Sequence, residues 1–126
     1  MSKPKKVAML VDDETAVQGL YRRLFDRDDW EGRVYGDARQ ALAALSPDVD
    51  CIVTDMVMPG MDGIRFIREI RARGRSVPIL VTTGFATEAS MRELAGLKVD
   101  VLPKPFAPTV LLDRLEQLLR ERKGGS

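Results

Sequence analysis

Charged residues stand at three points of the sequence where apolar runs end. Asp12 and Asp13 follow KVAMLV, Asp55 closes CIVTD, and Lys104 comes shortly after VDVL. Two carboxylates about 4 Å apart repel by about 4 kcal/mol at an effective dielectric constant of about 20, so three of them in one pocket need protons or a cation. Oxygen ligands without His or Cys favour a hard ion, and Mg²⁺ suits partial carboxylate coordination with retained waters.

These groups are suited to the transfer of a phosphoryl group. A carboxylate beside Mg²⁺, an ammonium group and a hydroxyl group can receive it, because the three neighbours stabilise charge on the phosphoryl oxygens. Lys104 would supply the ammonium group and Thr83 the hydroxyl, and Asp55 would be the nucleophile that forms an acyl phosphate. The chain contains no histidine, which excludes Ser-His-Asp and Cys-His catalysis and His-containing metal sites within it.

The composition is that of a single soluble domain. The 126 residues are 44% hydrophobic and 31% charged, with a net charge of +1. No bulk field attracts nucleic acid or an anionic membrane, so we expect neither direct nucleic-acid binding nor membrane insertion. The N-terminal sequence lacks the apolar region of a signal peptide. Cys51 is the single cysteine, which excludes an internal disulfide and fits a cytoplasmic location.

Strand-like apolar runs alternate with segments of helical periodicity. The expected strands are 6–11, 32–36, 51–55, 78–83 and 99–102, and the expected helices are about 15–27, 37–45, 63–73, 88–95 and a last one from Pro108. This alternation predicts an α/β fold with a doubly wound five-stranded parallel sheet, and the order 2-1-3-4-5 would make the first and third strands neighbours. Ligands of such sheets bind at the carboxyl ends of the strands, where the charged residues gather. Trp30 is expected before the second strand.

Four motifs resemble the receiver domain of two-component response regulators. They are VDDE (11–14), DMVMPGMDG (55–63), PILVTTG (78–84) and KPF (104–106). The match covers nearly the whole chain, in order and at the right spacing. It implies a flavodoxin-like (βα)5 receiver domain over residues 4–123, with flexible termini at 1–3 and 124–126.

The resemblance also implies a function. The chain would be a phosphorylation-dependent switch of a phosphorelay and not an enzyme, although it would assist its own phosphorylation and dephosphorylation. A sensor histidine kinase or a histidine phosphotransfer domain would donate the phosphoryl group. The response would appear on the face formed by the fourth and fifth strands with their helices, for an unknown downstream target, and this chain would carry no output domain.

By this resemblance the acidic residues have separate roles. Asp55 is the phosphoacceptor. Asp12 and Asp13 form the acidic pocket for Mg²⁺, with Asp13 as the more direct ligand. The backbone carbonyl of Val57 completes the ligands of the metal.

The resemblance assigns Thr83 the role of switch hydroxyl and Lys104 that of the phosphate-binding lysine. Lys104 would be joined to Pro105 by what is a cis peptide bond in many relatives. The chain departs from the family pattern at two positions: Val101 stands where relatives often have an aromatic residue whose rotamer follows phosphorylation, and Gly84 stands where alanine is common. We therefore expect a loop shift led by the threonine.

Four further residues carry expectations of their own. In this family, Val57 and Phe85 border the path of the attacking water. Neither can orient a water molecule by hydrogen bonding, so we expect a persistent phosphorylated state. Thr82 is expected to pack within its strand, and Glu14 to complement the start of the first helix.

Other interpretations stay open at this point. The chain could be the receiver segment of a larger hybrid histidine kinase. A small Mg²⁺-dependent phosphatase would need an acidic residue two positions after its nucleophile, where Val57 stands, and a substrate-recognition cap for which the chain is too short. A flavodoxin-like cofactor binder would suffer repulsion between its flavin phosphate and the acidic strand ends.

Overall fold

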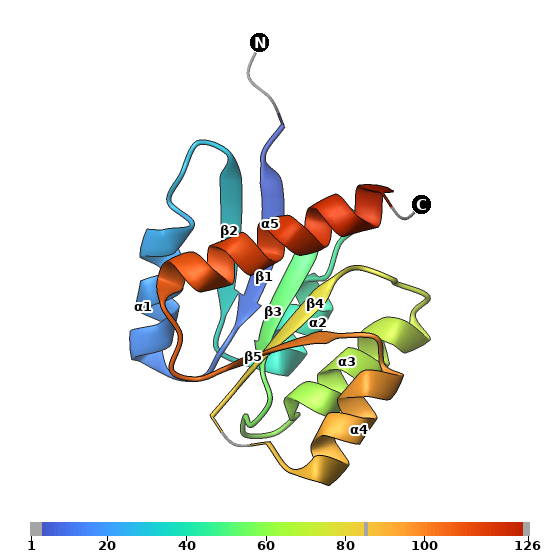
Figure 1. The fold of residues 1–126 in the computed structure, drawn as a ribbon. Helices are drawn as coiled ribbons and strands as arrows, with labels where there is room; N and C mark the ends of the chain where they lie inside the picture. Colours follow the sequence, from blue (N-terminus) through green and yellow to red (C-terminus); the bar gives the residue numbers. More distant parts are fainter. Residues whose placement is uncertain (1–3, 85, 125–126) are drawn as a thin grey trace.

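A five-stranded parallel sheet in the order β2-β1-β3-β4-β5 forms the centre of the molecule (Figure 1). The computed structural model describes residues 4–84 and 86–124. The strands are β1 (Lys6–Val11), β2 (Trp30–Tyr35), β3 (Cys51–Asp55), β4 (Ile79–Thr83) and β5 (Asp100–Pro103), and the helices are α1 (Thr15–Leu24), α2 (Ala38–Ala44), α3 (Gly63–Ala72), α4 (Glu88–Gly96) and α5 (Pro108–Gly124). The alternation and the strand order confirm the doubly wound α/β fold.

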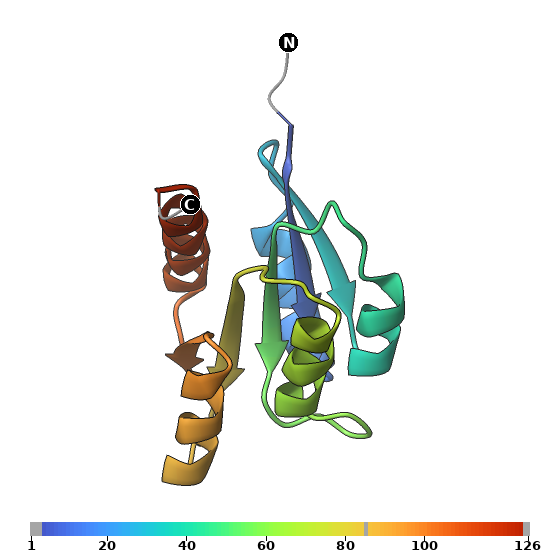
Figure 2. The same ribbon diagram turned by 90° about the vertical axis from the view of Figure 1, so that its right-hand side faces the viewer.

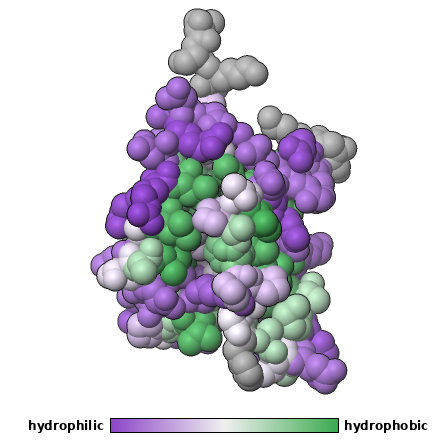
Figure 3. Space-filling model, turned by 60° about the vertical axis from the view of Figure 1, so that its left-hand side comes forward, coloured by the Kyte–Doolittle hydropathy of each residue, from purple (hydrophilic) through white to green (hydrophobic). Residues whose placement is uncertain are grey.

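The sheet is covered by two helical layers, because alternate residues of each strand face opposite sides. On β1, Met9 belongs to the core cluster that includes residues of α2, α3 and α4, whereas Leu10 belongs to the cluster that includes residues of α1 and α5. Figure 2 shows α3 and α5 on opposite sides of the sheet. On the side of α1, apolar side chains also reach the surface in a band framed by hydrophilic residues (Figure 3). This double cover explains why the central strands are apolar throughout.

Side chains that cap the backbone mark the starts of α2 and α4. Asp37 is the N-cap of α2, and its carboxylate accepts hydrogen bonds from the backbone N–H groups of Arg39 and Gln40. Thr87 and Ser90 form a reciprocal capping box at the start of α4. Gly124 ends α5, and the other residues expected to be flexible, 1–3 and 125–126, lie outside the described part of the chain.

The first helix is shorter than its apolar spacing predicts. It ends at Leu24 instead of residue 27, because the next residue, Phe25, turns into the core. The Phe25 ring meets the Trp30 ring edge to face, with their centroids 5.2 Å apart.

Our placement of Trp30 before the second strand is wrong. Trp30 is the first residue of β2 and pairs with Lys6 of β1. It is almost fully buried, and the Lys6 ammonium group lies 4.8 Å from the centroid of its ring. Packing against Phe25 and Lys6 therefore brings Trp30 into the sheet.

Trp30 lies at the amino end of its strand, whereas the acidic residues lie at the carboxyl ends. A six-residue strand spans about 20 Å. We therefore expect only a weak change in tryptophan fluorescence when Mg²⁺ is added. A strong, saturable quench that disappears in Asp13→Ala would contradict this separation.

None of the helices in the described ranges combines the length and the apolar character that crossing a lipid bilayer requires.

Candidate functional site

Three aspartates meet at the carboxyl ends of β1 and β3. These strands are neighbours, with Val11 opposite Thr54, so Asp12 and Asp13 after β1 come beside Asp55 at the end of β3. One carboxylate oxygen from each aspartate lies within 4.8 Å of the others. Asp12 is fully buried and Asp55 nearly so, whereas Asp13 is exposed. The strand order thus places three carboxylates together, and the Asp13 carboxylate is the one exposed to solvent.

Lys104 is shared between two of these carboxylates. Its ammonium nitrogen lies 3.2 Å from Oδ2 of Asp12 and 3.2 Å from Oδ2 of Asp55. Burial opposes the charged form of Lys104 most strongly, but the Asp12 and Asp55 charges together outweigh it and raise its pKa. Burial raises the pKa of Asp12, and Lys104 opposes this shift. One ammonium group thus faces three carboxylates, which leaves an excess of negative charge.

Backbone groups hold the two buried carboxylates in place. The N–H of Met56 donates to Oδ1 of Asp55 at 2.8 Å, and the N–H of Glu14 donates to Oδ1 of Asp12 at 2.9 Å. The start of α3 also presses against β3, because a Cβ atom at Gly63 would lie 2.3 Å from the Asp55 carbonyl oxygen. Glycine at position 63 is therefore needed for this close approach.

A hollow of about 330 Å³ opens above Asp55. Its lining residues are Asp13, Glu14, Asp55, Val57, Thr83, Gly84 and Lys104. Val57 is 71% exposed at the mouth, while Thr83 is buried. The side chains of Asp13, Asp55, Thr83 and Lys104 are therefore brought together, and Lys104 is hydrogen-bonded to Asp12. Every potential metal ligand among them is an oxygen atom.

Two observations refine the expectations from the sequence. Glu14 is the N-cap of α1, but its side chain makes no capping hydrogen bond, and the residue lines the hollow instead. The sequence could have indicated this position, because Glu14 is a third acidic residue directly after Asp12 and Asp13. The Lys104–Pro105 peptide bond is cis, as the resemblance implied. Phe85, expected to border the path of the attacking water, lies outside the described residues.

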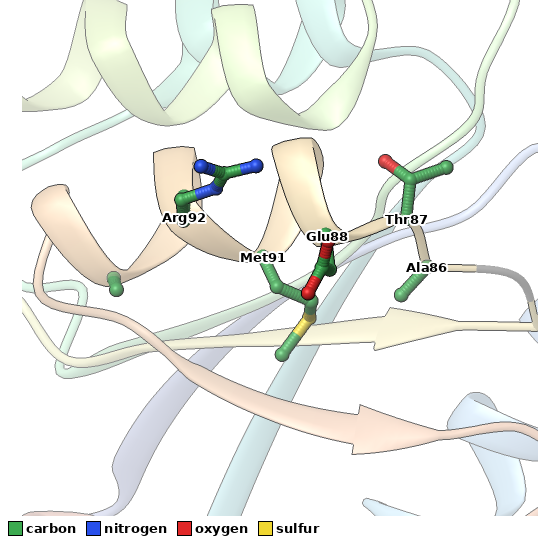
Figure 4. A pocket seen from close by; sticks show the side chains of 6 residues that line it. Ala86, Thr87, Glu88, Met91 and Arg92 are labelled. Carbon is green, nitrogen blue, oxygen red and sulfur yellow. The ribbon is translucent and has the colours of Figure 1, made fainter.

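A larger hollow, of about 560 Å³, lies on α4 (Figure 4). It is lined by Ala86, Thr87, Glu88, Met91, Arg92 and Ala95. Glu88 is the one carboxylate among these lining residues. The concentration of reactive groups therefore lies in the smaller hollow at the strand ends.

A family model described as the response regulator receiver domain matches residues 8–116. The chain belongs to this family. The receiver domain is 38% identical over 116 residues to response regulator MprA of Mycolicibacterium vanbaalenii, a match that covers 89% of this chain and 49% of the relative. The chain thus spans about half the length of the curated relatives it matches.

Solved receiver domains share the fold. The response regulator receiver domain protein (CheY-like) of Methanospirillum hungatei JF-1 superposes with a TM-score of 0.87 at 21% identity, covering 98% of this chain and 100% of that one. The chemotaxis protein CheY4 of Vibrio cholerae gives a TM-score of 0.83 at 27% identity, covering 91% of this chain and 99% of that one. The resemblance to receiver domains is therefore confirmed.

Proposed function

We propose that this receiver domain is a phosphorylation-controlled switch in which Asp55 accepts a phosphoryl group with the help of Mg²⁺. The observation that carries the proposal is the position of Lys104, whose ammonium group lies 3.2 Å from both Asp12 and Asp55. At that position it can neutralise two carboxylates in the resting state and turn to phosphoryl oxygens afterwards. The site is then arranged for charge that arrives on Asp55.

Asp55 is the carboxylate best placed to react. It lines the hollow, and its Oδ1 atom is fixed by the Met56 N–H. Asp12 is fully buried and cannot meet a donor, whereas Asp13 is exposed. In the proposed step a carboxylate oxygen of Asp55 forms a bond to phosphorus, the phosphorus–nitrogen bond of a phosphohistidine breaks, and the donor imidazole keeps the electron pair and takes up a proton.

The oxygen donors around the hollow fit Mg²⁺. Asp13, Asp55 and the Val57 carbonyl would hold the ion, with the buried Asp12 contributing its charge from below. When bound, Mg²⁺ neutralises part of the charge on the phosphoryl oxygens. Thr83 and Lys104 would contact the same oxygens from β4 and the β5–α5 connection.

The phosphohistidine must belong to a partner domain or protein outside this sequence, which has no histidine. We propose a sensor histidine kinase or a histidine phosphotransfer domain as that partner. The new contacts of Thr83 and Lys104 would shift the β4-α4-β5-α5 face toward a form that binds a downstream target. The phosphate can favour that form only by binding it more tightly than the resting form.

The function is tested with a small acyl-phosphate donor. Intact mass spectrometry should show one added phosphoryl group in the presence of Mg²⁺ and none in excess EDTA. Equal labelling in EDTA would contradict the proposal. A phosphomonoester substrate included in parallel should not be turned over, whereas sustained turnover would favour the phosphatase alternative.

Val57→Asn should shorten the lifetime of the phosphorylated state. Val57 is 71% exposed at the mouth of the hollow, so an amide there could orient the attacking water. The acceleration should stay below the ~100-fold of full general-base catalysis, because Asn does not take up the proton. Loss of the label is followed by mass spectrometry, with Val57→Ala as the control that removes bulk without adding a hydrogen-bonding group. If Val57→Asn and Val57→Ala decay alike, orientation of water is not the limiting factor.

A further inference from the structure

The side chains on the α1/α5 face of the sheet become polar at the carboxyl ends of three strands. Alternate residues share a face, and this face carries the apolar residues Leu10, Val53 and Leu80. Two positions later along each strand direction come Asp12, Asp55 and Thr82, the last two of which are register partners. These three residues therefore form a polar layer that ends the α1/α5 core below the acidic site.

A tyrosine of α1 lies in the core on this same face of the sheet. Tyr21 is fully buried within the apolar cluster on the α1/α5 face. Its hydroxyl group and that of Thr82 are both buried, and within residues 4–84 and 86–124 neither has a hydrogen-bond partner. A buried polar group without a partner lowers stability. A state in which both hydroxyl groups gain a hydrogen-bond partner would therefore be favoured.

The surroundings of Tyr21 point to the acidic site. Its pKa is raised, first by burial and then by the nearby charge of Asp12, with a smaller contribution from Asp55, whereas hydrogen bonding of the neighbouring Thr82 hydroxyl to the deprotonated phenol opposes the shift. The phenol therefore stays protonated and can act as a hydrogen-bond donor. A neutral donor therefore lies within range of the charge of the buried Asp12 carboxylate.

We propose that Tyr21 is a positioning residue that, together with Thr82, supports the Asp12 carboxylate when Lys104 turns to the phosphoryl group. In the resting structure Lys104 donates to Asp12 at 3.2 Å. Once Lys104 binds phosphoryl oxygens, Oδ2 of the buried Asp12 loses this donor, while Oδ1 keeps the Glu14 N–H. The buried hydroxyl groups of Tyr21 and Thr82, which have no other partner among the described residues, could donate to Oδ2 instead. This inference rests on the proposed phosphorylation of Asp55.

The test compares Tyr21→Phe with Tyr35→Phe, which removes the same hydroxyl group from the other tyrosine. The ligand is beryllofluoride, which mimics a phosphoryl group on a carboxylate, with saturating Mg²⁺. By calorimetry, Tyr21→Phe should bind it about tenfold more weakly, as for other groups that orient a ligating side chain, whereas Tyr35→Phe should bind like the wild type. Without ligand, the unfolding midpoint of Tyr21→Phe should be unchanged or higher, since an unpartnered hydroxyl is removed at constant shape.

Thr82→Val provides a second measurement. If the two hydroxyl groups act as a pair, the double variant should bind beryllofluoride about as weakly as Tyr21→Phe alone. Losses that multiply would overturn the paired role. Wild-type affinity in Tyr21→Phe, or an affinity loss matched by an equal loss of stability without ligand, would overturn the positioning role. If the wild type itself binds no beryllofluoride, the proposed function fails and this inference fails with it.

Discussion

Asp55→Asn should abolish the incorporation of a phosphoryl group by an acyl-phosphate donor. The amide of asparagine is not a nucleophile at neutral pH, and the other two carboxylates of the cluster are poor substitutes. Asp12 is fully buried. Asp55 contacts the Lys104 ammonium group at 3.2 Å, whereas Asp13 has no such ion pair within residues 4–84 and 86–124. Labelling should therefore fall to background instead of moving to a neighbour.

Asp62→Asn is the matched control for that experiment. Asp62 lies in the same β3–α3 connection, is exposed, and caps α3 by accepting from the Arg65 N–H at 2.9 Å. Asparagine also caps helices well, so this variant should be labelled like the wild type. Labelling that persists in Asp55→Asn, or is lost equally in Asp62→Asn, would contradict the assignment of the acceptor.

Asp13→Asn should remove the response to Mg²⁺ and stabilise the ion-free protein. Asp13 is the exposed member of the cluster, and one oxygen of its carboxylate lies within 4.8 Å of oxygens from Asp12 and Asp55. Neutralising it relieves repulsion between like charges, which should raise the unfolding midpoint in EDTA by about 3 °C. The same change removes a ligand, so the additional stabilisation by Mg²⁺ should disappear.

Thermal unfolding in EDTA and in Mg²⁺ measures both effects. Asp28→Asn serves as the control, because Asp28 is an exposed aspartate before β2, at the opposite end of the sheet. It should leave the stabilisation by Mg²⁺ unchanged. A wild-type Mg²⁺ response in Asp13→Asn would show that the ion binds elsewhere.

The architecture could be predicted because each strand is a short apolar run and each helix has its own cap or apolar stripe. Asp37, for example, starts α2 as its residue type indicates. The start of β2 could not be predicted in this way. Trp30 joins the sheet through contacts with Phe25 and Lys6, and such contacts between separate segments leave no periodic signal in the sequence.

The main groups of the site could be predicted because parallel strands place their carboxyl ends at one edge. The buried contacts of Tyr21 beneath the site could not be predicted. Tyr21 belongs to the apolar stripe of α1, and only the packing of α1 on the sheet brings its hydroxyl group beside Thr82. Arg71 is a similar case: as a charged residue of α3 it suggests a solvated surface, yet its guanidinium group donates to the carbonyls of Leu97 and Val77.

A crystal structure with Mg²⁺ and beryllofluoride is the most direct test of the central claim, that Asp55 receives the phosphoryl group in an acidic metal site. We expect beryllium bonded to a carboxylate oxygen of Asp55, with Mg²⁺ held by Asp13, Asp55 and the Val57 carbonyl. Lys104 should have moved from Asp12 to a fluorine atom. Beryllofluoride bound away from Asp55, or Mg²⁺ bound outside the aspartate cluster, would contradict the account.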